Sequence, residues 1–221
     1  MISPIRLVKD YKYCLFRSKT ESKYFIRSLF HKIWFHDKVL KSEPLSAGIP
    51  WMTYNAIFFL NNILKGDEIA FETGSGGSTI FYLERVQSLF SIEHESSWGE
   101  KLKRDKRIAK YSNKWEFYLR DLHKEKNNNN VDESPYLQRL RELPDDSFNL
   151  GSIDGRLRST SLIISADKIM SGGHLLLDNS DRKTYSKGME HLDNLGWEKK
   201  TLNGIGYNQE WESYSCVWRK P

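Results

Sequence analysis

Residues 69–79 read Ile69-Ala70-Phe71-Glu72-Thr73-Gly74-Ser75-Gly76-Gly77-Ser78-Thr79. The apolar start predicts a strand, the glycines predict a tight turn, and the apolar run that follows, residues 80–83, predicts a helix. Such a turn can cradle a nucleotide, because its backbone N–H groups face the ligand and its glycines allow close approach. Glu72, two residues before the first glycine, favours a ligand with a cationic or hydroxyl-rich end over a bare pyrophosphate.

Strands and helices alternate along residues 50–221. Helices are predicted at residues 51–65, 80–86, from 97, 135–143, 160–170 and 184–195, and strands at 69–71, 88–93, 115–119, 148–153, 174–177, 197–201 and 211–218. Strands separated by helices form a parallel, doubly wound sheet. The last two strands have no helix between them, which predicts an antiparallel hairpin at the sheet edge. The sequence therefore indicates one α/β domain.

The amino-acid composition indicates which class of protein this chain belongs to. The chain has 221 residues, of which 38% are hydrophobic and 29% charged, as in an ordinary globular domain. No apolar run approaches the ~20 residues that span a bilayer, and the first residues lack an apolar signal-peptide core. Cys14 and Cys216 lie far apart, so we expect reduced thiols and a cytoplasmic protein.

Residues 1–49 are predicted to be a basic helical N-terminal extension, and residues 50–221 the catalytic domain. Residues 1–41 hold ten Lys or Arg against three acids, while the whole chain carries +5. An apolar helical stripe runs through Phe25, Ile26, Leu29, Phe30, Ile33 and Trp34. The helix can pack on the domain, form a homodimer, or make peripheral contact with the inner face of the membrane. Nucleic acid is not expected, since no binding motif accompanies the charge.

Acidic side chains recur where the predicted strands end. Glu93 ends the second strand, Asp121 follows the third, Asp154 ends the fourth, and Asp178-Asn179 follow the fifth. Open α/β sheets bind ligands at the carboxyl ends of their strands. We therefore expect these side chains to gather around one ligand site.

The pattern Glu72-x-Gly74-x-Gly76, with Glu93, Asp121 and Asp154, resembles class I S-adenosylmethionine-dependent methyltransferases. Four segments are similar to a group of bacterial methyltransferases: residues 50–54, 74–79, 153–156 and 177–182. The resemblance covers roughly residues 50–218. It implies a Rossmann-like, mostly parallel seven-stranded sheet with an antiparallel terminal hairpin, and S-adenosylmethionine as the cofactor.

The resemblance also implies roles for the site residues. Glu72 and the turn would hold the methionine end of the cofactor, Glu93 the ribose hydroxyls, and Asp121 would lie near the adenine. His94 would form a wall of the cofactor pocket. The predicted cofactor-binding set is Glu72, Gly74, Ser75, Gly76, Ser78, Thr79, Glu93, His94, Asp121 and Asp154.

Asp154, Asp178 and Asn179 would converge because their strands are neighbours in this sheet, ~5 Å apart. Their oxygens suit Mg²⁺, and the pattern resembles catechol-type O-methyltransferases, in which a metal lowers the pKa of a substrate hydroxyl. Gly155-Arg156-x-Arg158 departs from that family, which has a lysine there. Without a metal, Asp154 or Asp178 would be the general base and Arg156 would orient an anionic substrate.

Two other functions stay open. Glu93 would also fit a nicotinamide dinucleotide oxidoreductase, although Gly74-x-Gly76-x-x-Thr79 lacks the third glycine or alanine of that fingerprint. The chain could also be a non-catalytic cofactor-binding or scaffold protein. The favoured prediction is a methyltransferase that acts on oxygen of a small-molecule, sugar or lipid-linked acceptor, with or without Mg²⁺. The acidic residues could also be solvated strand ends without a ligand.

Overall fold

This computed structural model describes residues 44–122, 134–207 and 212–221. The predicted basic extension, with its membrane or dimer contacts, lies almost wholly outside these residues. Its last part, α3 (Pro44–Ala47), is described, and Leu45 and Ile49 pack into the core of the domain. Within the described ranges, no helix is long and apolar enough to cross a membrane.

The centre of the molecule is a seven-stranded sheet in the order β3-β2-β1-β4-β5-β9-β6. Its strands are β1 (Ile69–Thr73), β2 (Ser88–Glu93), β3 (Trp115–Leu119), β4 (Phe148–Ile153), β5 (Ile169–Asp178), β6 (Glu198–Thr201) and β9 (Ser215–Arg219). Strands β1 to β5 are parallel, and β9 runs antiparallel to both β5 and β6. The predicted fold class and terminal hairpin are confirmed. A short antiparallel pair, β7 (Gly204–Ile205) and β8 (Glu212–Ser213), lies outside this sheet.

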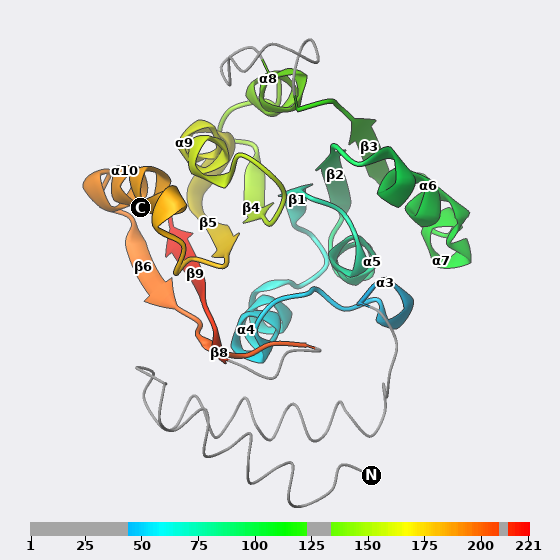
Figure 1. Cartoon of the computed structure of the whole chain (residues 1–221), viewed down its shortest axis with the longest axis horizontal. Coiled ribbons are helices and arrows are strands. Elements are labelled where there is room, and N and C mark those ends of the chain that lie inside the picture. Colours follow the sequence, from blue (N-terminus) through cyan, green and yellow to red (C-terminus); the bar gives the residue numbers. More distant parts are fainter. Residues whose placement is uncertain (1–43, 123–133, 208–211) are drawn as a thin grey trace, which may run out of the picture.

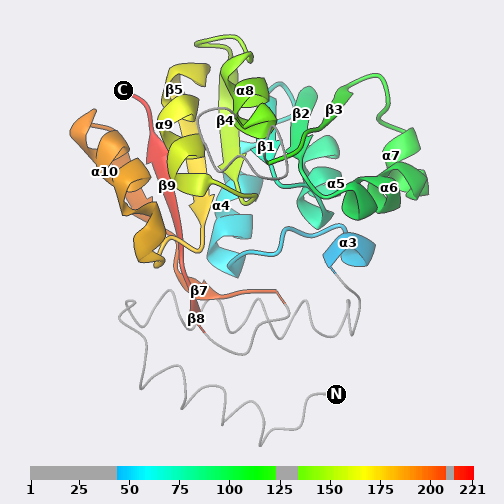
Figure 2. The same cartoon turned by 45° about the horizontal axis from the view of Figure 1, so that its top comes forward.

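Helices cover both faces of the sheet (Figures 1 and 2). One face carries α8 (Pro135–Arg141), α9 (Arg158–Lys168) and α10 (Ser186–Asn194), whose apolar residues form one core cluster with Phe71 and Phe148. The other carries α4 (Tyr54–Ile63), α5 (Gly77–Leu83), α6 (Ser96–Arg104) and α7 (Lys106–Ala109), which share a second cluster. A 3₁₀ turn, η2 (Lys183–Tyr185), precedes α10.

Several predicted boundaries were wrong, among them that of the strand predicted at residues 211–218, which the structure divides into β8 and β9. Two more follow from the ends of helices. Helix α4 begins at Tyr54 rather than at residue 51, because the Thr53 hydroxyl accepts the Ala56 amide at 3.1 Å and caps the helix there. Trp51 therefore precedes the helix, and its side chain is exposed although Met52 and Thr53 beside it are buried. Strand β5 begins at Ile169, five residues before the predicted start, because α9 ends at Lys168 and Ile169 is already extended.

Two glycines let the turns after β1 and β4 pack backbone against backbone. Gly74 has a φ of +86°, and a Cβ there would lie 2.6 Å from the Gly155 nitrogen. A Cβ on Gly155 would lie 2.8 Å from the Gly74 nitrogen and would also meet the Tyr136 hydroxyl. The close approach brings the ends of β1 and β4 together at one rim.

Candidate functional site

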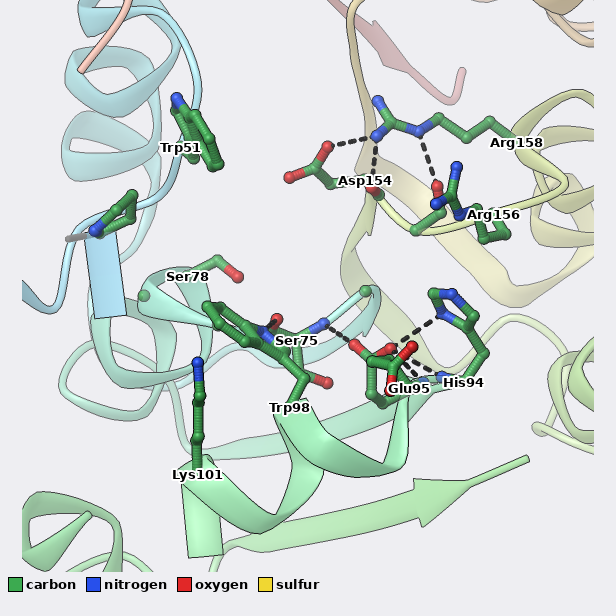
Figure 3. A pocket seen from close by; sticks show the side chains of 16 residues that line it. Trp51, Ser75, Ser78, His94, Glu95, Trp98, Lys101, Asp154, Arg156 and Arg158 are labelled. Carbon is green, nitrogen blue, oxygen red and sulfur yellow. Dashed lines mark hydrogen bonds and ion pairs between the residues drawn. The ribbon is translucent and has the colours of Figure 1, made fainter. Parts of the chain in front are cut away.

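A cavity of about 670 Å³ opens at the carboxyl ends of β1, β2 and β4 (Figure 3). It is lined by Pro44, Trp51, Gly74, Ser75, Gly76, Gly77, Ser78, Glu93, His94, Glu95, Trp98, Lys101, Asp154, Gly155, Arg156 and Arg158. Eight predicted site residues are among them. Glu72, Thr79 and Asp121 are not, and Asp178 and Asn179 line a neighbouring cavity.

The Glu93 carboxylate is fixed in the cavity wall by backbone amides. Its Oε2 accepts from the Ser75 amide at 2.7 Å, and its Oε1 from the amides of His94 and Glu95 at 2.7 and 2.9 Å. His94 Nδ1 also lies 2.9 Å from Oε1. Burial alone would raise the pKa of Glu93, but the hydrogen bonds from His94, Ser75 and Glu95 bring it below its ordinary value. A charged carboxylate with acceptor capacity left on Oε2 suits a hydroxyl of a ligand.

Glu72 lies behind the turn rather than in the cavity. Its carboxylate accepts from the hydroxyls of Ser78, Thr79 and Ser91 at 2.7, 2.5 and 2.8 Å. Burial, together with the nearby charge of Glu93, raises its pKa to about 7, although the hydrogen bonds from the three hydroxyls lower it. Direct contact between Glu72 and a cofactor stays a prediction. Through these hydrogen bonds, Glu72 holds the turn and the start of α5 in place.

Asp121 is exposed, away from the cavity lining, and its carbonyl accepts from the Tyr136 amide at 3.1 Å. Its predicted position near adenine stays a prediction. On α6, the Trp98 indole donates to the Ser75 carbonyl and Lys101 Nζ lies 5.0 Å from the Trp98 ring centroid. Sequence reasoning missed these two residues. The available signal was an aromatic residue in the first turn of the helix after the Glu93 strand.

A second cavity of about 480 Å³ adjoins the first. Its lining is polar: Trp51, Asp154, Arg158, Asp178, Asn179, Asp181, Arg182, Glu212, Ser213 and Tyr214. The two cavities share Trp51, Asp154 and Arg158. Trp51 is 56% exposed, so an aromatic face is available to ligands at this junction. The site thus offers two adjoining ligand spaces with a carboxylate between them.

Two of the side chains predicted to bind Mg²⁺, Asp154 and Asn179, contact the Arg158 guanidinium instead. Its Nη2 lies 2.7 Å from Asp154 Oδ1, and its Nη1 donates to the Asp178 carbonyl at 2.7 Å and to Asn179 Oδ1 at 3.3 Å. In the described ranges, no three His, Cys, Asp or Glu side chains gather as a metal site. Since the Arg158 guanidinium occupies Asp154 Oδ1 and Asn179 Oδ1, and the Asp178 carboxylate accepts from Ser215 and Asn179, these residues do not fit Mg²⁺ as they are arranged.

Asp178 is a buried support for this arrangement. Its Oδ1 accepts from the Ser215 hydroxyl at 2.7 Å and its Oδ2 from the Asn179 amide at 2.8 Å. Burial raises its pKa to about 7, and the negative charge of Asp154 contributes. With both oxygens engaged and 2% exposure, Asp178 is badly placed to act directly as a base.

Asp154 is the carboxylate that faces both cavities, and its side chain is 27% exposed. Oδ1 pairs with Arg158, whereas Oδ2 has no hydrogen bond to any residue that the structure describes. Burial raises the pKa of Asp154, and Arg158 opposes the rise. Arg156 is exposed and lines the first cavity, where it can meet an anionic group of a ligand.

No family model and no curated protein sequence matches the chain. Among solved structures, the O-methyltransferase TomG of Streptomyces achromogenes, in complex with SAM, is similar with a TM-score of 0.59 at 13% identity, over 92% of this chain and 100% of that chain. A putative O-methyltransferase from Klebsiella pneumoniae gives 0.54 at 14%, over 90% and 99%. A precorrin 8w decarboxylase from Methanobacterium thermoautotrophicum gives 0.55 at 15%, over 76% and 89%. The chain therefore has the Rossmann-like fold of the class I methyltransferases.

Proposed function

We propose that this protein is an S-adenosylmethionine-dependent methyltransferase that methylates an oxygen of a small-molecule, sugar or lipid-linked acceptor. One observation carries the proposal: a cavity of cofactor size, with a fixed carboxylate in its wall, adjoins a polar cavity across Asp154. Ligand cavities of ~300–1,000 Å³ are usual for molecules of this size. Solved structures with this fold include one in complex with SAM.

The first cavity fits the cofactor by its chemistry. The Ser75 hydroxyl is buried there and has no hydrogen-bond partner within the described residues. A buried hydroxyl without a partner is costly, and a polar ligand would satisfy it. We assign the ribose hydroxyls to Glu93, the amino-acid end to the turn at residues 74–78, and a flanking position to Trp98. S-adenosylmethionine, when bound, supplies an electrophilic methyl group.

The second cavity would hold the acceptor. Asp154 Oδ2 is placed to take the proton of an acceptor hydroxyl as that oxygen gains the methyl group. The polar lining of the second cavity and the exposed face of Trp51 favour a hydroxyl-rich acceptor over a purely apolar one. Asp154 replaces Asp178 as the favoured general base, because both oxygens of Asp178 are already hydrogen-bonded.

Calorimetry with S-adenosylhomocysteine and with NAD⁺ and NADH tests the cofactor assignment. We expect wild type to bind S-adenosylhomocysteine and Glu93→Ala to bind it about 10- to 100-fold more weakly, the usual effect of losing a hydrogen bond to a charged group. Glu100→Ala, which removes an exposed carboxylate of α6, is the matched control. Folded wild type that binds NAD⁺ or NADH but no S-adenosylhomocysteine would refute the proposal.

The role of the basic extension stays a proposal based on charge, since residues 1–43 lie outside the described residues. Its excess of Lys and Arg suits an anionic membrane surface, and its apolar stripe suits a second copy of the chain. Sedimentation with phosphatidylglycerol vesicles and light scattering of the full chain test the two cases separately.

A further inference from the structure

We propose that Arg158 takes the place of a metal ion at the junction of the two cavities. Its guanidinium is the permanent cation that holds the ends of β4 and β5 together and turns Asp154 Oδ2 toward the acceptor. Arg158 is thus a positioning residue that acts through Asp154. The acceptor part of this inference rests on the proposed function, whereas the cation site does not.

Five oxygens from two strand ends converge on the guanidinium. Besides the contacts with Asp154 Oδ1, Asn179 Oδ1 and the Asp178 carbonyl, Nε donates to the Gly155 carbonyl at 2.9 Å and Nη2 donates to the Asp154 carbonyl. Arg158 itself is 8% exposed. Carboxylate, amide and carbonyl oxygens are the donors that hard metal ions take. Here the planar fork of one arginine satisfies them.

The backbone on both sides supports this placement. Leu157, which precedes the arginine, has a φ of 52°, and Asn179, which supplies one oxygen, has a φ of 54°. Asparagine adopts left-handed backbone readily, whereas the same conformation is unfavourable for a bulky residue such as leucine. A chain keeps such a conformation where the surrounding contacts over-determine it. The Leu157 turn is what directs Arg158 inward.

Charge makes arginine and a metal ion mutually exclusive at this place. The guanidinium keeps its charge in proteins, so a divalent ion among the same oxygens would meet strong repulsion at short range. Arg156 shows the contrast. It stands two residues earlier, is exposed, and within the described residues its side chain forms no hydrogen bond or ion pair with the oxygens around Arg158.

Manganese titration of the full chain, followed by electron paramagnetic resonance, tests the proposal. The samples are wild type, Asp154→Asn, Arg158→Met and the matched control Arg156→Met, each with and without S-adenosylhomocysteine. We expect wild type and Arg156→Met to show no stoichiometric Mn²⁺ site. Arg158→Met should bind one Mn²⁺ at least about tenfold more tightly, because a cation has left a cluster of oxygens. Adding Asp154→Asn to Arg158→Met should abolish that site.

Two outcomes would overturn the proposal: one Mn²⁺ bound by wild type and lost in Asp154→Asn, or no Mn²⁺ bound by folded Arg158→Met. If Arg158→Met does not fold, Arg158→Gln, which keeps two donors, is used for the same comparison. S-adenosylhomocysteine binding is measured on the same samples. Its absence in wild type would refute the proposed function without changing what the Mn²⁺ data say about the cation site.

Discussion

Glu72 ties the glycine turn to the sheet through one buried carboxylate. Its folded pKa of about 7 exceeds the ordinary 4.5, so its contribution to stability is full below pH ~4.5 and is lost as pH rises toward 7. We expect Glu72→Gln to remove this loss. Between pH 5 and pH 8, wild type should lose about 2 kcal/mol more of its unfolding free energy than Glu72→Gln does. Urea unfolding at both values measures it, with Glu100→Gln as the exposed control; equal pH dependence in wild type and Glu72→Gln would contradict the assignment.

Residue 155 has to be glycine because the structure leaves no room for a side chain there. A methyl group there would collide with the Gly74 nitrogen and the Tyr136 hydroxyl. We expect Gly155→Ala to lower the free energy of unfolding by about 1–3 kcal/mol, the usual cost of overpacking, and to weaken S-adenosylhomocysteine binding. Gly66→Ala is the comparison, since a Cβ there meets nothing within 4 Å and its φ of +111° reports backbone strain alone. Denaturant unfolding and calorimetry give both quantities, and unchanged ligand binding in Gly155→Ala would speak against the paired turns.

At the scale of elements, α7 holds α3, whose Pro44 lines the first cavity. Arg107 donates to the carbonyls of Ser46 and Leu45 at 3.0 and 2.7 Å and pairs with Asp105 at 2.6 Å. We expect Arg107→Met to release α3, so that backbone amides of residues 45–49 exchange with solvent faster, at least about tenfold. Arg104→Met, whose side chain is 82% exposed, serves as the control. Hydrogen exchange read by mass spectrometry checks this, and equal rates in wild type and Arg107→Met would show that α3 is held by other contacts.

Sequence patterns could predict this fold because strands, glycine turns and strand-end acids are local features. They also predicted that Ser75, Glu93 and Asp154 lie at one site, because strand ends meet at one sheet edge, and all three residues line the first cavity. The same patterns gave a role to Arg156 and none to Arg158, whose place among the strand-end oxygens the sequence did not predict. That place depends on the left-handed turn at Leu157 and on the packing of β5 beside β4. Trp98 was missed for a related reason: which face α6 turns to the site is decided by tertiary packing.

For the whole molecule, the order of strands explains where the cavity lies. The order reverses between β1 and β4, and the helices that follow them, α5 and α9, pack on opposite faces of the sheet. A crevice opens at such a switch point, beyond the carboxyl ends of the strands. The hairpin of β6 and β9 closes the other edge, and Ser215 of β9 holds Asp178. Segments far apart in the sequence therefore line one candidate ligand site.

From this strand order we predict which backbone amides a bound ligand will protect from hydrogen exchange. When S-adenosylhomocysteine binds, amides of residues 74–78, 93–98 and 154–158 should exchange with solvent more slowly together, because all three segments line one cavity. Amides of α10, which contributes no residue to that lining, should be unchanged. Hydrogen exchange of the full chain with and without ligand measures this. Protection at residues 74–78 alone would mean that the ligand contacts the turn without filling the crevice, and protection centred on α10 would place the ligand elsewhere.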